Sequence, residues 1–298
     1  MERDVAASAP DLRLRAVQTR SRRTDFIQGL LRNKGALAGL IILLLLILAA
    51  IFAPVITRYD PVVIDPPQRT QPPSSDHWLG TDAFGRDIYT RVVYGARVSL
   101  PVGLIAVSIA ASVGAVLGLI AGYYGRFADA IIMRLIDILL AFPNIMLALV
   151  VVAILGPSIR NVMIAVGVGA IPSYTRLIRG QVLSARELLY VEAAKVIGVP
   201  TSKIMYRHIL PNVVSPVIVL GTLSVGSAIL ASAGLSFLGL GAQPPRPEWG
   251  AMLADGRSFL SSHWWVATMP GIAIAITVLS INMFGDGLRD ILDPRIRT

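Results

Sequence analysis

The longest polar interruption in the apolar second half of the chain reads VEAAKVIGVP at residues 191–200 and HILPN at residues 208–212. A helix is predicted over 182–197, because apolar residues recur there three and four positions apart. These apolar residues are Val182, Ala185, Leu189, Ala193 and Val196. The segment is therefore predicted to form two short helices with a break between them.

The break is predicted from the residues that follow the first helix. Gly198 can adopt the left-handed conformation that ends many helices, and Pro200 cannot continue a helix. Thr201 stands where an N-cap is expected. The second helix should then end at Pro211, since proline disrupts a helix interior.

This spacing resembles the EAA loop of bacterial ABC-importer permeases. The residues that carry the resemblance are Glu192, Ala193, Ala194, Gly198, Ile209, Leu210 and Pro211. In that family the loop is the cytoplasmic coupling helix, which docks into a cleft on the ATP-binding subunit. The two alanines suit a helix that another protein approaches closely. The alternative is an amphipathic connector between membrane helices, but the full spacing between hydrophobic runs favours the coupling helix.

The composition of the chain is that of a membrane protein. Its 298 residues are 54% hydrophobic and 15% charged, whereas soluble proteins carry about 25% charged residues. A net charge of +9 would suggest nucleic-acid binding in a soluble domain, but here it indicates basic cytoplasmic ends, and we expect no nucleic-acid partner. The sequence contains no cysteine, which excludes disulfides, thiolate catalysis and Cys-ligated zinc.

Six apolar runs predict an all-α membrane protein with six transmembrane helices, since a span needs ~20 apolar residues. The expected spans are 35–57, 99–122, 130–155, 163–183, 217–240 and 265–284. The resemblance implies the type I fold of ABC-importer permeases. The expected organisation is a cytoplasmic tail at 1–34, the first helix at 35–57, an extracytoplasmic loop at 58–98, a permease core at 99–284 with the coupling loop at 184–212, and a cytoplasmic tail at 285–298. The first run exceeds the ~7–15 residues of a signal-peptide core and predicts a retained anchor.

The extracytoplasmic loop ends in a second motif, LGTDAFGRD at residues 79–87. Local chemistry predicts a turn and a short helix, with Asp87 and Arg91 forming an i,i+4 pair. The pattern resembles the first loop of the dipeptide/oligopeptide permease subfamily, through Gly80, Thr81, Asp82, Gly85, Arg86 and Asp87. A calcium site is the alternative for an Asp-rich loop, but the EF-hand spacing is absent.

The distribution of basic residues predicts the orientation. With the N-terminus inside, the inner segments hold 19 of the 27 Lys and Arg residues, and the outer segments hold 8. Positive charge concentrates on the cytoplasmic side of membrane proteins. Both termini and the coupling segment are therefore expected in the cytoplasm, and the protein in the bacterial cytoplasmic membrane.

Several residues inside the spans have more than one interpretation. Arg134 and Asp137 could relay a proton or a substrate, but we expect a structural i,i+3 pair near the cytoplasmic surface. The prolines at 143, 172 and 270 mark either flexible gates or kinks that neighbouring helices satisfy. The glycines at 114, 118 and 122 should let another helix backbone approach closely.

No catalytic or metal site is expected, and no cofactor. His77, His208 and His263 fall in different loops on both sides of the predicted membrane. The sequence also lacks the Gly-x-x-x-x-Gly-Lys-Ser/Thr pattern that cradles nucleotide phosphates. ATP would therefore be bound and hydrolysed by partner subunits, and this chain would not be an enzyme.

Two motifs and a closing pattern at 285–295 together resemble the C-type permease of dipeptide/oligopeptide importers, over nearly the whole chain after Lys34. The resemblance implies a second homologous permease, two ATP-binding subunits and an extracytoplasmic solute-binding protein. The implied cargo is peptides, with nickel or glutathione as alternatives in the same subfamily. An ion-coupled carrier is the competing class, but the midplane acidic sites and inverted repeats typical of such carriers are not evident. A membrane enzyme is disfavoured by the missing catalytic residues.

Overall fold

The computed structural model describes residues 29–292, and this part of the chain is helical with no β-strand. The long helices are α2 (Lys34–Ile51), α4 (Ile88–Tyr124), α5 (Arg126–Leu140), α6 (Asn144–Leu155), α7 (Ile159–Ala185), α10 (Leu210–Phe237) and α12 (Trp265–Leu292). The short helices are α3 (Ala53–Ile56), η1 (Pro66–Gln68), α8 (Leu189–Val196), α9 (Thr201–Lys203), η2 (Ile204–Ile209), α11 (Trp249–Gly256) and η3 (Arg257–Phe259).

The number of membrane-spanning helices agrees with the sequence. Five helical segments are long and apolar enough to cross a membrane: α2, α4, α7, the continuous run 201–237 and α12. The bent pair α5 and α6 makes a sixth when it is counted as one span. The prediction of an all-α membrane protein with six spans is therefore confirmed.

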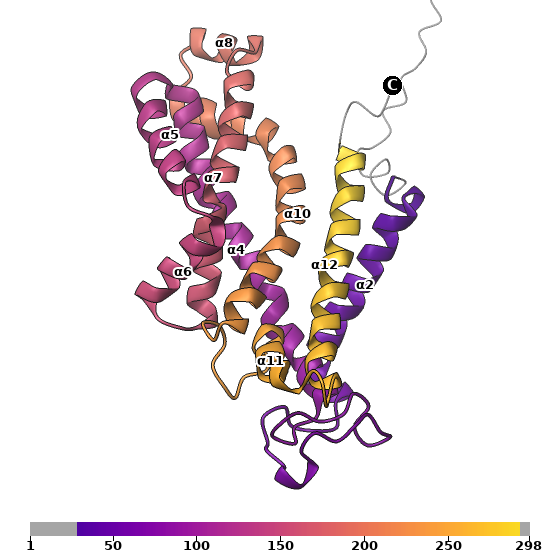
Figure 1. Ribbon diagram of the computed structural model, residues 1–298. Coiled ribbons are helices and arrows are strands. Elements are labelled where there is room, and N and C mark those ends of the chain that lie inside the picture. Colours follow the sequence, from indigo (N-terminus) through magenta and orange to yellow (C-terminus); the bar gives the residue numbers. More distant parts are fainter. Residues whose placement is uncertain (1–28, 293–298) are drawn as a thin grey trace, which may run out of the picture.

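The helices form two groups that meet at α4 and α10 (Figure 1). On one side α4 packs along α7, with α5 and α6 outside; on the other, α2 packs along α12. The α4–α7 contact depends on the three glycines spaced four residues apart. A Cβ atom at Gly114, Gly118 or Gly122 would lie 2.5–2.8 Å from Cβ atoms of α7. The close approach predicted from this spacing is confirmed.

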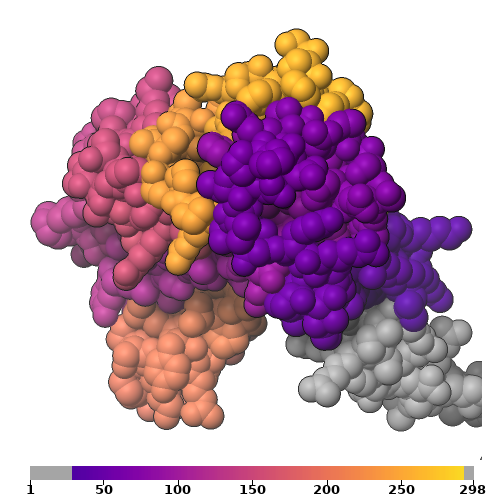
Figure 2. Space-filling view, turned by 90° about the horizontal axis from the view of Figure 1, so that it is seen from below, coloured from indigo at the N-terminus to yellow at the C-terminus, as the bar shows by residue number. Residues whose placement is uncertain are grey.

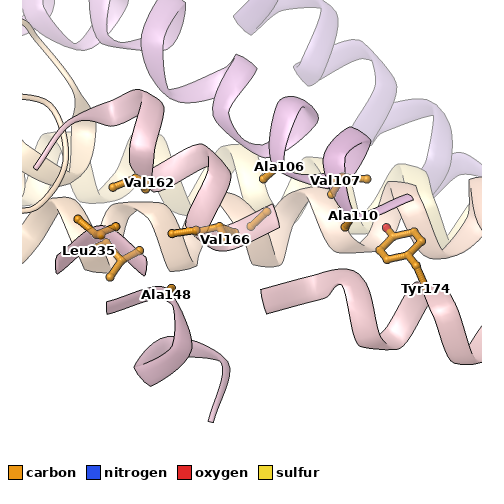
Figure 3. Packing of buried hydrophobic residues seen from close by; sticks show 11 residues of the cluster. Ala106, Val107, Ala110, Ala148, Val162, Val166, Tyr174 and Leu235 are labelled. Carbon is orange, nitrogen blue, oxygen red and sulfur yellow. The ribbon is translucent and has the colours of Figure 1, made fainter. Parts of the chain in front are cut away.

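A cluster of buried apolar side chains joins α4, α6, α7 and α10 (Figure 3). Its members include Ala106, Val107, Ala148, Val166 and Tyr174. A second cluster lies under α8, and a third packs around the fully buried Trp249 of α11. These clusters position the two ends of the molecule, where both sequence motifs lie.

The third expected span is not a single helix. It divides into α5 and α6, which bend by 92° around Pro143. Proline lacks the N–H that would continue the helix, and here it occupies the N-cap of α6. Pro172 and Pro270, in contrast, lie inside continuous helices. The prediction of a continuous span over 130–155 was wrong in this respect.

Other helix limits also differ from those expected. The second span has no separate short helix before it, because α4 begins at Ile88. Pro211 does not end a helix; it lies in the first turn of α10. Proline is tolerated there because the N–H groups of the first turn have no hydrogen-bond partner inside the helix. The last helix continues past Phe284 to Leu292. Residues 1–28 and 293–298, including most of the expected tails, lie outside the described residues.

Candidate functional site

The two sequence motifs lie at opposite ends of the molecule. Figure 1 shows α8 at one end and the loop between α3 and α4 at the other. The N-terminal end of α2 and the C-terminal end of α12 lie toward the same end as α8. Seen from the loop end, the loop and the segment following α10 cover the surface side by side (Figure 2).

The α8 segment is held to the membrane helices by its inward side chains. Val191 and Ala194 are buried against Ile204 and Ile209, in a cluster that includes Val182 of α7. The helix predicted over 182–197 is interrupted, because α7 ends at Ala185 and α8 begins at Leu189. The chain therefore turns away from α7 before the EAA residues, and α8 lies across the end of the bundle (Figure 1).

Gly198 ends this helix as expected from its position. Its φ is +80°, in the left-handed region. Val199 N–H donates to the Ala194 carbonyl at 3.0 Å, and Gly198 N–H donates to the Lys195 carbonyl at 3.0 Å. This pair of hydrogen bonds is the Schellman arrangement. The N-cap of the next helix is Pro200, so the prediction that Thr201 caps it was wrong.

The remaining motif residues divide between surface and interior. Glu192, Ala193 and Gly198 are exposed, and so is Pro211. Ala194 and Ile209 are buried within the chain, and Leu210 is half-buried. Ala194 therefore makes its close contacts inside this chain, which leaves Ala193 as the small residue that a partner could approach.

An exposed apolar patch surrounds the outward residues of α8. It consists of Leu189, Val196 and Ile197, whose exposed fractions are 82%, 82% and 78%. Side chains of this size are not normally left in water at such exposure when they lie together, and such patches mark interaction sites. We call these three residues the α8 patch. The surrounding segment, residues 186–207, contains the basic residues Arg186, Lys195, Lys203 and Arg207 and the acidic residues Glu187 and Glu192.

Two polar residues connect α8 to the start of α10 by hydrogen bonds. The Asn212 side-chain amide donates to the Tyr190 hydroxyl at 2.9 Å and to the His208 carbonyl at 2.8 Å. The π-helical turn η2 runs from Ile204 to Ile209, so wider i→i+5 bonding leads into Pro211. No role for Tyr190 or Asn212 was predicted from the sequence. Only the position of Asn212 after Pro211 in the motif could have drawn attention to it.

The loop motif at residues 79–87 is a closed, buried turn around one carboxylate. Asp82 accepts hydrogen bonds from the N–H groups of Phe84 at 2.8 Å and Arg86 at 3.0 Å, and from Arg86 Nε at 2.6 Å. The Nε atom of Arg91 lies 3.4 Å from Asp82. Gly85 has φ +77°, and a Cβ there would overlap the Asp65 carbonyl.

Asp87 joins the same loop to the first membrane helix of the core. It caps α4 by accepting the Thr90 N–H at 2.7 Å, and His77 Nδ1 lies 3.0 Å from its other oxygen. The expected Asp87–Arg91 pair does not form. Arg91 instead donates to the Pro61 carbonyl at 2.6 Å. Thr81 is buried and hydrogen bonds to the backbone of residues 68 and 71.

Asp255 of α11 completes the charge cluster from the far end of the sequence. Its carboxylate lies 3.8 Å from Arg86. Burial raises the pKa of Asp255, while the positive charges of Arg86 and Arg91 act in the opposite direction. The loop motif residues thus satisfy one another, and the motif acts as a structural closure of the loop on α4 and α11.

The charges inside the third span pair with another helix. Arg176 of α7 donates to Asp137 at 2.6 Å, so the expected Arg134–Asp137 pair was wrong. Arg179 of α7 forms a two-point pair with Asp129 of α5. These pairs join α5 to α7.

Comparison with known proteins decides the family. Residues 114–298, more than half of the chain, match the binding-protein-dependent transport system inner membrane component family. The chain belongs to this family of ABC-transporter permeases. Residues 21–73 of the permease match the N-terminal transmembrane domain of oligopeptide transport permease C. The prediction from the EAA spacing is therefore confirmed at the level of the family.

The permease is also similar to individual curated proteins along most of its length. It is 53% identical to the dipeptide transport system permease protein DppC of Alkalihalophilus pseudofirmus over 267 residues, covering 90% of this chain and 88% of the relative. It is 45% identical to the glutathione transport system permease protein GsiD of Pectobacterium atrosepticum, covering 98% and 97%.

A solved structure shows the same fold. A chain of the MetNI methionine ABC transporter, in inward-facing conformations, superimposes with a TM-score of 0.53 at 18% identity. The match covers 67% of this chain and 96% of the other. This likeness concerns the fold of the membrane helices, and it agrees with the permease fold expected from the sequence.

Proposed function

We propose that this permease forms half of the translocation pathway of an ATP-driven importer for dipeptides and other short peptides. The observation that carries the proposal is the 53% identity to a dipeptide transport permease along nine-tenths of the chain. The chain itself would be non-catalytic. Its partners would be a homologous second permease, two ATP-binding subunits and an extracytoplasmic solute-binding protein.

The arrangement of the two ends supports this proposal. The α8 patch offers an exposed apolar surface, which suits docking on an ATP-binding subunit. The loop that this buried motif closes at the other end provides a surface toward the side from which a binding protein would deliver solute. Import of glutathione, itself a peptide derivative, is the second candidate, because a glutathione permease is 45% identical over nearly the whole chain.

The substrate is tested by uptake. Cells that lack their own peptide importers and express the complete transporter should accumulate labelled dialanine only when ATP is available. A transporter that accumulates labelled glutathione but not dialanine under the same conditions would contradict the peptide assignment. Accumulation that follows an imposed ion gradient without ATP would contradict the ABC mechanism itself.

The orientation is tested with single cysteines, because the native chain has none. Ser75 in the loop and Ser202 in α9 are both exposed and lie at opposite ends. In intact cells, an impermeant maleimide should label Ser75→Cys and should leave Ser202→Cys unlabelled until the membrane is permeabilised. The reverse pattern would place α8 outside, away from ATP.

The bend at Gly198 is tested with a substitution that strains the backbone. Gly198→Val should abolish uptake, because a β-branched side chain disfavours the positive φ, at about 1–3 kcal/mol. No atom lies within 4 Å of the added Cβ, so a steric clash is not the cause. Gly180→Ala is the matched control, since Gly180 also has free space but is helical. Wild-type uptake by Gly198→Val would show that the bend is not required.

A further inference from the structure

A cavity of about 370 Å³ lies between α4, α6, α7 and α10. Its lining includes Ala106 of α4, Tyr174 of α7 and Ser224 of α10. Ala106 is the middle residue of α4, and the other two lie within two residues of the middle of their helices. The cavity is therefore placed at mid-depth of the membrane-spanning bundle.

The polar groups of this cavity are all neutral and can all donate hydrogen bonds. They are Asn144, Ser173, Tyr174, Ser224 and Ser227. The other lining residues are apolar, and the described part of the chain contributes no Lys, Arg, His, Asp or Glu side chain to the lining. A cavity of this composition in a membrane bundle favours a ligand that accepts several hydrogen bonds while its remaining surface is apolar.

Tyr174 is the strongest indication that a ligand is missing. Its exposed fraction is 1%, and its hydroxyl has no hydrogen-bond partner among the described residues. The hydroxyl of Ser224 lines the same cavity but does not reach hydrogen-bond geometry with it. Figure 3 shows the hydroxyl directed toward Val107 and Ala110 of α4, which offer only apolar side chains. A buried hydroxyl without a partner is unfavourable, so its presence calls for an acceptor that binds there.

The start of α6 lies at the same cavity. Asn144 and Ile145, the first residues of this twelve-residue helix, line it together with Ala148 one turn further on. Within the described residues, no side chain caps this N-terminus. The first N–H groups of a helix have no partner inside the helix and carry partial positive charge. The break at Pro143 therefore places the positive end of a helix in the middle of the bundle.

We propose that this cavity binds a carboxylate of the transported solute, which on the proposed function is the C-terminal carboxylate of a short peptide. The Tyr174 hydroxyl and the first N–H groups of α6 donate hydrogen bonds to it. Broken helices whose N-terminal ends face anionic groups occur at mid-membrane sites in other transporters. Because no full positive charge is present, the site holds a carboxylate without trapping it.

The test uses the complete transporter in lipid nanodiscs without ATP, with Ser224→Cys as a reporter in the cysteine-free permease. The reaction of this cysteine with methyl methanethiosulfonate is followed by mass spectrometry. Dialanine at ten times its dissociation constant should slow the reaction about tenfold, because an occupied site is protected. Dialanine amide, which lacks the carboxylate, should not slow it.

Two variants separate binding from other effects. Tyr174→Phe combined with Ser224→Cys should lose the protection by dialanine while the complex stays assembled, since the removed hydroxyl has no hydrogen-bond partner within residues 29–292. Ser215→Cys, exposed near the α8 end of α10, should react at a rate that dialanine does not change. Equal slowing of the Ser215 reporter would overturn the assignment of the site to this cavity.

Each remaining outcome also tests one part of the proposal. Equal protection by the amide would overturn carboxylate recognition, and no protection by either compound would mean that the cavity holds only water. Unchanged protection with Tyr174→Phe would overturn the role of Tyr174. ATP-dependent dialanine uptake is measured in parallel with the wild-type complex. If uptake occurs without protection, this inference fails and the proposed function stands; if uptake is absent, the proposed function fails.

Discussion

We expect Leu189→Asp to reduce ATP-driven uptake to background and to separate the ATP-binding subunits from the permease. Leu189 is 82% exposed in the α8 patch and occupies the first position of α8. If the patch is buried in the complex, the new carboxylate must be desolvated without a partner, which costs roughly 3–5 kcal/mol. A loss of ~3 kcal/mol corresponds to roughly a hundredfold weaker association.

The permease itself should tolerate this substitution. An aspartate in the first turn of a helix interacts favourably with the helix dipole, so α8 is retained. The inward residues Val191 and Ala194, which pack against Ile204 and Ile209 of η2, are unchanged. Membrane levels of the permease should therefore stay near those of the wild type, and the loss of uptake should reflect docking alone.

Co-purification of the ATP-binding subunits with tagged permease measures this effect. The matched control is Val63→Asp, which replaces another exposed apolar residue at the opposite end of the molecule. Val63→Asp should leave co-purification unchanged. Full retention of the ATP-binding subunits by Leu189→Asp would show that the α8 patch is not the docking surface. Loss of the permease from the membrane would mean that α8 is required for folding.

Local and compositional features of this fold could be predicted because they depend on neighbouring residues. The apolar runs determine the spans, since a lipid-exposed helix needs apolar side chains along its whole length. The glycines at 114, 118 and 122 share one face of α4, so a close helix contact follows from their spacing alone. Gly198 was predicted to end α8 because only the preceding residues and its own conformational freedom decide this.

The features that were missed depend on residues far apart in the sequence. Asp137 pairs with Arg176, 39 positions away, rather than with its near neighbour Arg134. Pro143 breaks its helix whereas Pro172 does not, and local sequence treats them alike. Likewise, the orientation of Ala193 and Ala194 about the axis of α8 is set by packing on η2, which the sequence motif does not reveal.

The functional sites, too, include one part that local sequence predicts and one part that depends on residues far apart in the chain. The α8 segment was located from its motif, and the structure adds which of its residues face outward. The cavity at Tyr174 was not anticipated, because its lining comes from four helices and its polar residues are isolated serines, one asparagine and one tyrosine. The only local signal was Pro143, whose break places the start of α6 in the middle of the bundle.

The second large effect is expected on stability, from a substitution in the loop motif. There, one carboxylate lies between two buried arginines and partly neutralises their charge. Asp82 lies within 2.6 Å of Arg86 Nε and 3.4 Å of Arg91 Nε, and all three side chains are buried. The same carboxylate also accepts two backbone N–H groups, which form the turn. Removing its charge leaves the two cations close together, and the remaining acidic partner among the described residues is the partly exposed Asp255, 3.8 Å from Arg86.

Asp82→Asn should therefore destabilise the permease by roughly 3–5 kcal/mol, the usual penalty for breaking a buried ion pair from one side. The midpoint of thermal unfolding of the purified complex measures this destabilisation. The lowered midpoint should persist in 1 M salt, where the Debye length is ~3 Å, because salt screens surface charges strongly but buried charges poorly. Asp76→Asn, in the same loop but exposed, is the matched control and should leave the midpoint unchanged. Asp255→Asn should have a smaller effect than Asp82→Asn, since Asp255 is 3.8 Å from Arg86 and 44% exposed. A midpoint that Asp82→Asn does not lower would mean that water reaches the two arginines, and that the loop is closed by its backbone hydrogen bonds alone.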